Sequence, residues 1–195
     1  MRSILIIIKL SFLFISSVVL AKDIPVIVIA PGKTIQSLST VGTNVTVISG
    51  EEIRNSNENF LGNIIDKTST STNLFQMGGD GTNMAIQLRG LEKRYSTVYI
   101  DGIKMSDPAS PDNSFYFQNI SKDSIERVEI LKGNQSSLYG ANAIVGTIHI
   151  FTKKGKLGHR KNTEIKSGSN NSKGIHHSID GANDKIDYYV SLSRY

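Results

Sequence analysis

The chain has 195 residues, with 22 Lys and Arg against 17 Asp and Glu, and it contains no cysteine. This length predicts one domain with an appended piece, and the lack of cysteine excludes a disulfide framework, so stability must come from a packed core or a surrounding partner. The charge balance is mild and no basic patch with interleaved aromatic residues appears, so no nucleic-acid partner is predicted.

The first residues predict a secretory signal peptide, residues 1–21, that is cleaved after Ala21. Arg2 supplies a basic start, the stretch from Ile4 to Leu20 is strongly apolar, and small residues precede the cleavage point. The alternative is a membrane anchor, but the apolar stretch after Lys9 is short for a span of about 20 residues. Cleavage removes Arg2 and Lys9, which takes 22 basic side chains to 20 against 17 acidic ones, a net charge of +3.

Residues 22–33 hold an apolar, β-branched run between two prolines. Pro25 lacks an N–H group, which argues against a central strand, and Pro31-Gly32 ends the run. Two interpretations are equally favoured by this pattern. The segment adds as a strand to the sheet edge of another protein, or it is the first strand of its own domain.

The next elements are predicted from periodicity and capping. Thr43–Ile48 is expected to be a strand, and Ser49 to Glu52 has the pattern of a capping box that starts a helix. A second helix is predicted from about Glu58 to Lys67, because apolar residues fall on one face at helical spacing. Its expected core residues are Phe60, Leu61, Ile64 and Ile65.

Polar loops then alternate with strands. Thr68–Asn73 and Met77–Asn83 are predicted as loops by composition, and Met84–Arg89 as a strand. Asp101-Gly102 between two alternating runs predicts a hairpin, since both turn positions need a positive φ. Residues 106–119 form a long polar and aromatic loop, which a compact domain rarely keeps without a use.

Ser124 to Lys154 predicts two strands joined by a turn and a run of small residues. Charged and apolar residues alternate in the first strand, and the small residues permit close backbone approach. After Lys156, three amphipathic segments of residues 162–171, 172–181 and 185–195 have the alternation of transmembrane β-strands. The alternative is a soluble antiparallel meander.

Four motifs together resemble the N-terminal part of TonB-dependent outer-membrane receptors, most closely the cobalamin-transporter-like branch. They are LRG at residues 88–90, VYIDGIKM at 98–105, IERVEILKG at 125–133 and LYGANAIVGTIHIFTK at 138–153. The resemblance implies an α+β fold: a small mixed-sheet plug domain followed by the first antiparallel strands of a transmembrane β-barrel. It places a TonB-box-like segment at 22–33, the plug domain at 34–155 and the start of the barrel at 156–195.

The resemblance also implies roles for individual residues. A TonB-type energy-coupling protein would pair with the box-like segment, although Pro25 interrupts its apolar run. The residues of this segment are Asp23, Ile24, Pro25, Val26, Ile27, Val28 and Ile29. Charges that face a polar barrel wall would be Arg89, Glu126, Arg127, Glu129 and Lys132, the alternative being a solvated strand face. Loops toward the ligand would carry Asp80, Asp107, Asp112 and Tyr116.

The expected function is energy-coupled uptake of a scarce small molecule or metal chelate, such as cobalamin or a ferric siderophore, across the outer membrane, with the plug gating the barrel. The alternative is a truncated, plug-only periplasmic protein that binds a ligand or partner without transport. The chain stops at Tyr195, within the expected third barrel strand, and a barrel must close, so we expect a fragment, a truncated frame or half of a split gene.

Catalysis is not predicted, because no nucleophile, base and orienting group occur in a motif. No cofactor and no metal ion are predicted either. His176 and His177 are neighbours and would point to opposite faces of a strand, so they make a poor chelate. His149 alternates with Ile148 and Ile150 and is expected on the polar face of its strand.

Overall fold

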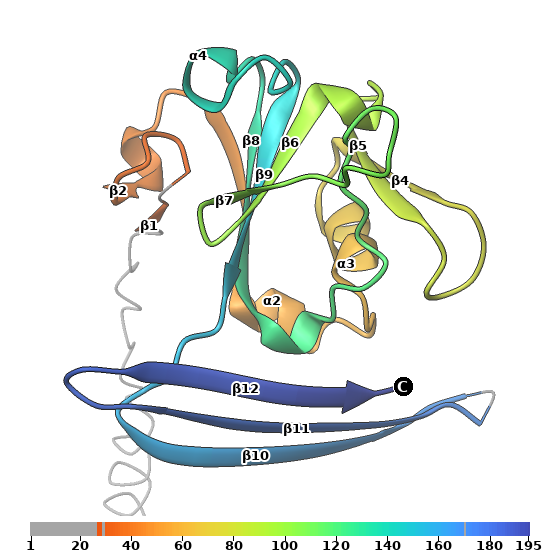
Figure 1. The fold of residues 1–195 in the computed structure, drawn as a ribbon, viewed down its shortest axis with the longest axis vertical. Coiled ribbons are helices and arrows are strands. Elements are labelled where there is room, and N and C mark those ends of the chain that lie inside the picture. The colour runs from red at the N-terminus through yellow and green to blue at the C-terminus, as the bar shows by residue number, and fades with distance from the viewer. Residues whose placement is uncertain (1–26, 29, 170) are drawn as a thin grey trace, which may run out of the picture.

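The computed structural model of the chain describes residues 27, 28, 30–169 and 171–195. Figure 1 shows the arrangement of its strands and helices. In chain order these are β1 (Ile27–Val28), β2 (Gln36–Ser37), β3 (Asn44–Ile48), α2 (Gly50–Asn55), α3 (Leu61–Thr68), β4 (Thr72–Gln76), β5 (Met84–Leu88), β6 (Ser96–Ile100), β7 (Ile103–Met105), β8 (Ile125–Lys132), α4 (Ser136–Tyr139), β9 (Gly146–Thr152), β10 (Gly158–Ser167), β11 (Lys173–Ala182) and β12 (Asp187–Arg194). Short 3-10 turns are η2 (Leu38–Thr40), η3 (Lys93–Tyr95) and η4 (Lys122–Ser124).

A mixed five-stranded sheet with the order β3-β8-β9-β6-β7 forms the centre of the fold. Only the β6–β9 pair is parallel, and the other three pairs are antiparallel. The β4–β5 hairpin and α3 lie to one side of this sheet, and the short β1–β2 pair lies on the other side (Figure 1). The predicted Asp101-Gly102 hairpin is confirmed, with φ values of 49° and 84° joining β6 to β7.

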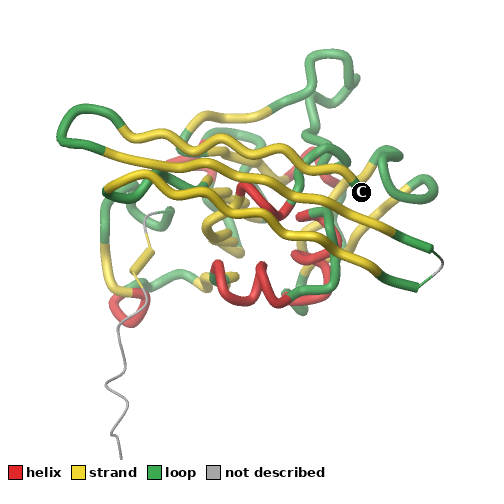
Figure 2. Tube along the Cα trace, turned by 90° about the horizontal axis from the view of Figure 1, so that it is seen from below, coloured by secondary structure: helices red, strands yellow, loops and turns green. Residues whose placement is uncertain are grey.

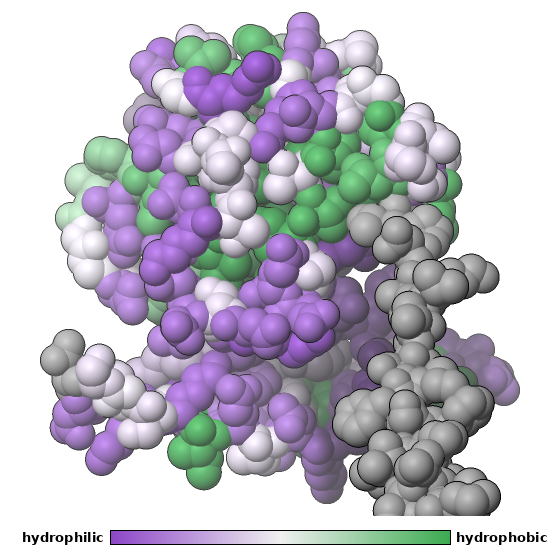
Figure 3. Space-filling model, turned by 180° about the vertical axis from the view of Figure 1, so that it is seen from behind, coloured by the Kyte–Doolittle hydropathy of each residue, from purple (hydrophilic) through white to green (hydrophobic). Residues whose placement is uncertain are grey.

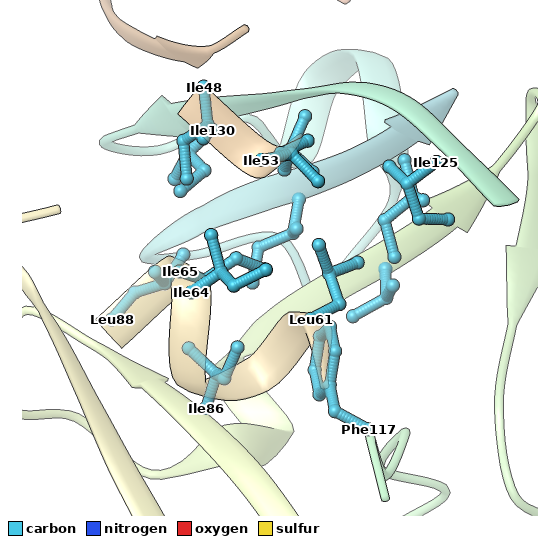
Figure 4. Packing of buried hydrophobic residues seen from close by; sticks show 14 of the residues in the cluster. Ile48, Ile53, Leu61, Ile64, Ile65, Ile86, Leu88, Phe117, Ile125 and Ile130 are labelled. Carbon is cyan, nitrogen blue, oxygen red and sulfur yellow. The ribbon is translucent and has the colours of Figure 1, made fainter. Parts of the chain in front are cut away.

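The main core lies between the central sheet, α2, α3 and the β4–β5 hairpin (Figure 4). Leu61, Ile64 and Ile65 of α3 are at most 1% exposed, as the helical spacing predicts. They pack against apolar side chains from the strands, among them Ile48, Ile86, Leu88 and Ile130. Burying each such side chain contributes about 1.5–3 kcal/mol, so this cluster supplies most of the driving force for folding.

Two helix starts show how local and long-range contacts set the ends of elements. The capping box at α2 is confirmed, because Ser49 accepts from the backbone of Glu52 and the Glu52 carboxylate accepts from the backbone of Ser49. Helix α3 begins at Leu61, later than predicted. Phe60 has an extended backbone and forms an isolated antiparallel β-bridge with Ser121, and the Leu61 N–H donates to the Ile120 carbonyl. Because Phe60 takes part in this strand-like pairing, the helix begins only at Leu61.

Strand β4 corrects the prediction of a loop at Thr68–Asn73. The loop ends early, because Thr72 already pairs with Leu88 in the antiparallel β4–β5 ladder. Thr and Asn in this stretch have the composition of a loop, but β5 offers a free edge of hydrogen-bonding groups to pair with. Tertiary pairing therefore overrides composition here.

The segments after Lys156 form a separate antiparallel sheet with the order β10-β11-β12. Figure 2 shows its three long strands running across one end of the molecule. Their predicted alternation is confirmed: Ile165, Val190 and Leu192 are 64–79% exposed on one face, whereas His176 and Ser178 are buried on the other. Among the described residues, the helices are all too short or too polar to span a membrane.

Candidate functional site

The charges predicted to meet a barrel wall do not form one cluster. Glu126 and Arg89 are exposed, Lys132 is half-buried, and the Arg127 guanidinium lies 3.8 Å from the ring centre of Phe151. Burial, followed by the charge of Arg89, lowers the pKa of Lys132. Contact of these four side chains with a barrel stays a prediction.

Glu129 requires a correction, because its side chain is 0% exposed and does not face outward. Its Oε1 atom accepts a hydrogen bond from Arg127 Nε at 2.9 Å, and its Oε2 atom accepts one from the Ala30 N–H at 2.8 Å. The alternation of β8 correctly placed Glu129 on the polar side of the strand. The N-terminal segment covers that side, which the local pattern does not reveal.

The N-terminal segment packs onto the sheet through residues just after the start of the described chain. Val28 is 0% exposed and Ala30 is 2% exposed. Strand β1 pairs with β2 over two residues, outside the central sheet. Of the predicted box, Ile27 and Val28 thus pair within their own chain, and their role toward a partner stays a prediction. The other box residues, Asp23, Ile24, Pro25, Val26 and Ile29, lie outside the described residues.

An aromatic cavity of about 260 Å³ lies beside this segment. His149 stacks on Tyr99 with ring centres 4.8 Å apart and 6° between planes, and Tyr139 meets the His149 ring edge-on with centres 4.8 Å apart. Burial first, and the charge of Lys33 second, lower the pKa of the His149 imidazole to about 4. The expected polar face is confirmed, because His149 pairs with Glu129 across β8 and β9 and its Nε2 atom lies 2.9 Å from Thr147 Oγ1. The side chain is nevertheless only 5% exposed, because two tyrosines cover the ring.

Two of the four predicted ligand-loop residues come together through a residue that sequence reasoning missed. Lys93 Nζ lies 2.8 Å from Asp112 Oδ2 and 4.8 Å from the ring centre of Tyr116. The hydrogen bond from Lys93, with further bonds from Ser110 and Ser114, holds the pKa of Asp112 well below its usual range. Lys93 stands in a charged turn before a predicted strand. The local sequence there is that of a solvated lysine, and the ion pair becomes apparent only from the contact with the later loop.

The other two predicted loop residues lie apart from this ion pair. Asp107 Oδ1 accepts from the Ala109 N–H at 2.9 Å within its own loop. Asp80 is exposed in the loop between β4 and β5. Within the described ranges, no three His, Asp or Glu side chains gather as metal ligands do.

Asp123 is a second polar centre that the sequence analysis missed. This buried carboxylate in η4 accepts from Ser193 Oγ at 2.8 Å and from the Tyr195 hydroxyl, and its Oδ2 atom lies 3.4 Å from His176 Nδ1. Burial alone would raise the pKa of Asp123, but hydrogen bonds from Tyr195 and Ser193 lower it. Asp123 thus joins the first domain to β11 and β12.

Hydrophilic side chains gather where the three-stranded sheet meets the rest of the molecule (Figure 3). A hollow of about 430 Å³ at this junction is lined mainly by charged residues, including Arg54, Lys122, Lys153 and Glu164. The Lys122 ammonium group donates to the Ser56 carbonyl, so it is held by the domain side of the junction.

Comparison with known proteins gives one family match and several relatives. Residues 37–147, more than half of the chain, match the model of the TonB-dependent Receptor Plug Domain. The vitamin B12 transporter BtuB of Vibrio vulnificus strain CMCP6 is 28% identical over 147 residues, which are 75% of this chain and 24% of the relative. The rhizobactin receptor of Rhizobium meliloti strain 1021 is 34% identical over 134 residues, 67% of this chain and 17% of the relative.

Solved structures show the same fold. The ferripyoverdine receptor of the Pseudomonas aeruginosa outer membrane superposes with a TM-score of 0.70 at 16% identity, covering 87% of this chain and 22% of the receptor chain. The siderophore receptor PiuA of Acinetobacter baumannii gives a TM-score of 0.63 at 24% identity, covering 81% and 21%. The chain thus spans about a quarter or less of the length of these proteins.

Proposed function

The chain belongs to the TonB-dependent receptor plug domain family, and from this premise we propose that it is the N-terminal part of an outer-membrane receptor for energy-coupled uptake. The observation that carries the proposal is the plug match over residues 37–147, followed directly by the amphipathic sheet of β10 to β12. In this role residues 34–155 act as the plug and residues 156–195 begin a barrel. Transport, not catalysis, is the activity, as in the named transporters and receptors among its relatives.

The ligand is a scarce metal chelate of the cobalamin or ferric siderophore class. Support comes from the relatives, which include a vitamin B12 transporter and a rhizobactin receptor. On the plug side, the ion pair of Lys93 and Asp112 with the Tyr116 ring offers a cation, an anion and an aromatic face on neighbouring loops. Asp80 and Asp107, which lie apart from this ion pair, are proposed to offer further carboxylates to the ligand from their own loops.

Residues 22–33 are the segment that a TonB-type energy-coupling protein would engage from the periplasm, after a signal peptide of residues 1–21 is removed. The apolar, β-branched sequence of Val26 to Ile29 suits pairing as an added strand. The short β1–β2 pair supports this proposal, because two residue pairs hold the segment far less firmly than a full ladder.

Cysteine cross-linking tests the proposal directly, because the natural chain has no cysteine that would interfere. A Val26→Cys variant of the chain is expected to form a disulfide with single cysteines on the sheet edge of a TonB-type periplasmic domain. Ser137→Cys, on the exposed surface of α4, is the matched control and should not cross-link. Absence of any cross-link along residues 23–28 would overturn the energy-coupling role, and recovery of the chain in the periplasmic rather than the outer-membrane fraction would favour the plug-only alternative.

A further inference from the structure

We propose that Glu129 and Tyr139 form a clamp on the backbone of Ala30, which positions the N-terminal segment on the plug and controls its release. The Glu129 carboxylate holds the Ala30 N–H, and the Tyr139 hydroxyl holds the Ala30 carbonyl. The consequence for transport rests on the proposed function. The clamp itself is a property of the fold and is testable without a partner.

Glu129 is a costly residue to bury unless its charge is satisfied. Its carboxylate is 0% exposed on β8, where desolvation of an ionised group disfavours folding. One oxygen accepts from Arg127 and the other from Ala30, a residue 99 positions earlier in the chain. Detaching the N-terminal segment removes one of these bonds, so the segment and the carboxylate stabilise each other.

Tyr139 forms the other half of the clamp at the end of α4. Its ring is held by Tyr99 and His149, with centres 5.1 Å and 4.8 Å away, and Lys33 lies over it at 5.1 Å. Burial first, then Tyr99 and Glu129, raise the pKa of the Tyr139 hydroxyl to about 12. The hydroxyl therefore stays protonated at neutral pH and donates to the Ala30 carbonyl.

These two bonds take the place of a strand ladder. Among the described residues, strand β1 pairs with β2 and with no strand of the five-stranded sheet. Ala30 nevertheless has both backbone groups satisfied, by side chains from β8 and α4. A pull on the residues before Ala30 would load the two residue pairs of β1 and β2 and, through the clamp, β8 and α4.

Hydrogen exchange of the full chain tests the clamp, with Tyr139→Phe as the main variant because it removes the hydroxyl and keeps the ring. The backbone amides between residues 28 and 33, where Pro31 has none, are expected to exchange about tenfold faster, the effect of one lost hydrogen bond. Glu129→Gln, which removes the charge and keeps the shape, is expected to act in the same direction. In Tyr139→Phe, peptides from β8 and β9 should exchange as in the natural chain.

Tyr99→Phe is the matched control, because its hydroxyl lies in the same cavity but donates to the Tyr139 carbonyl at 3.2 Å rather than to Ala30. It is expected to leave the exchange of residues 28–33 within about threefold of the natural chain, since the clamp bonds remain. Unchanged exchange of residues 28–33 in the folded Tyr139→Phe variant overturns the clamp. If Glu129→Gln does not fold, Tyr139→Phe alone decides.

The cross-linking experiment separates this inference from the proposed function. Faster exchange in Tyr139→Phe without any cross-link to the TonB-type domain keeps the clamp and removes the energy-coupling role. A cross-link from Val26→Cys with unchanged exchange keeps the energy-coupling role and removes the clamp. If both are right, Tyr139→Phe also raises the cross-linking rate of Val26→Cys.

Discussion

The five-stranded sheet and the three-stranded sheet of this chain share an alternating sequence pattern but differ in what covers them. In β8 and β9, Val128, Ile130 and Ile148 are 0% exposed, because α3 and the β4–β5 hairpin pack over them. In β10, by contrast, every residue is exposed except one half-buried lysine. The alternation of apolar and polar residues gives the strands of both sheets two different faces. An apolar face stabilises the fold where a second layer of the protein covers it and removes it from water.

Matched leucine substitutions give the largest expected contrast between the two sheets. Leu61→Ala leaves a cavity at the centre of the core and is expected to cost about 2–5 kcal/mol of unfolding free energy. Leu192→Ala removes the same atoms from a side chain that is 78% exposed on β12, so a change within about 0.5 kcal/mol is expected. Urea titration followed by circular dichroism measures both, and equal losses would refute the contrast.

The buried histidine of the five-stranded sheet predicts a pH dependence of stability. The pKa of His149 falls from 6.5 to about 4 on folding, so the unfolded chain binds more protons between these values. The contribution of neutral His149 to the free energy of unfolding is therefore fully present above about pH 6.5. The free energy of unfolding falls by on the order of 3 kcal/mol as the pH drops to 4.

Urea midpoints at pH 7 and pH 4 measure this loss. His149→Phe keeps an aromatic ring in the stack and removes the titration, so the difference between the two midpoints should shrink. His177→Gln on the exposed face of β11 is the control and should leave the difference as in the natural chain. A His149→Phe profile that matches the natural one would show that other groups cause the acid sensitivity.

Asp123 joins the two sheets, and its removal is expected to uncouple them. Asp123→Asn weakens the bonds from Ser193 and Tyr195 and removes the charge beside His176, at a cost of about 1–3 kcal/mol. Because the lowered pKa of Asp123 is a folded-state property, this contribution is present above the unfolded value of about 3.9 and is lost at lower pH.

Hydrogen exchange distinguishes this uncoupling from a general loss of stability. Peptides from β11 and β12 are expected to exchange faster in Asp123→Asn, while β8 and β9 stay protected. Asp187→Asn, an exposed residue of β12, is the matched control. Equal acceleration in β8 and β12 would mean that Asp123 supports the whole fold and not the junction.

The sequence predicted those features of the fold that depend on neighbours along the chain. These features depend on residues that are only a few positions apart in the sequence. They are the capping box of α2, the core face of α3, the Asp101-Gly102 hairpin and the alternation of the last strands. The α+β fold of a plug followed by first strands came from the four motifs, and the structural relatives confirm it.

The candidate site was less predictable, because its contacts join distant segments. Glu129 meets Ala30 across 99 positions, and Asp123 meets Tyr195 across 72. In a single sequence, each of these residues has the pattern of a solvated strand or turn. The burial of His149 was not predictable for the same reason, since the tyrosines that cover it come from β6 and α4.

The smallest expected effect concerns the N-cap of α2, a feature that the local sequence predicts. Ser49→Ala removes the side-chain acceptor for the Glu52 N–H at the start of α2, and a loss of about 1 kcal/mol is expected. Ser137→Ala, at an exposed position within α4, removes a hydroxyl without a cap and is expected to change stability by less than about 0.5 kcal/mol. Because α2 contacts β8 and η4, the Ser49 variant should also accelerate exchange at the junction slightly, whereas the Ser137 variant should not. Equal stability of the two variants in urea titration would mean that packing of Ile53, and not the cap, holds α2 in place.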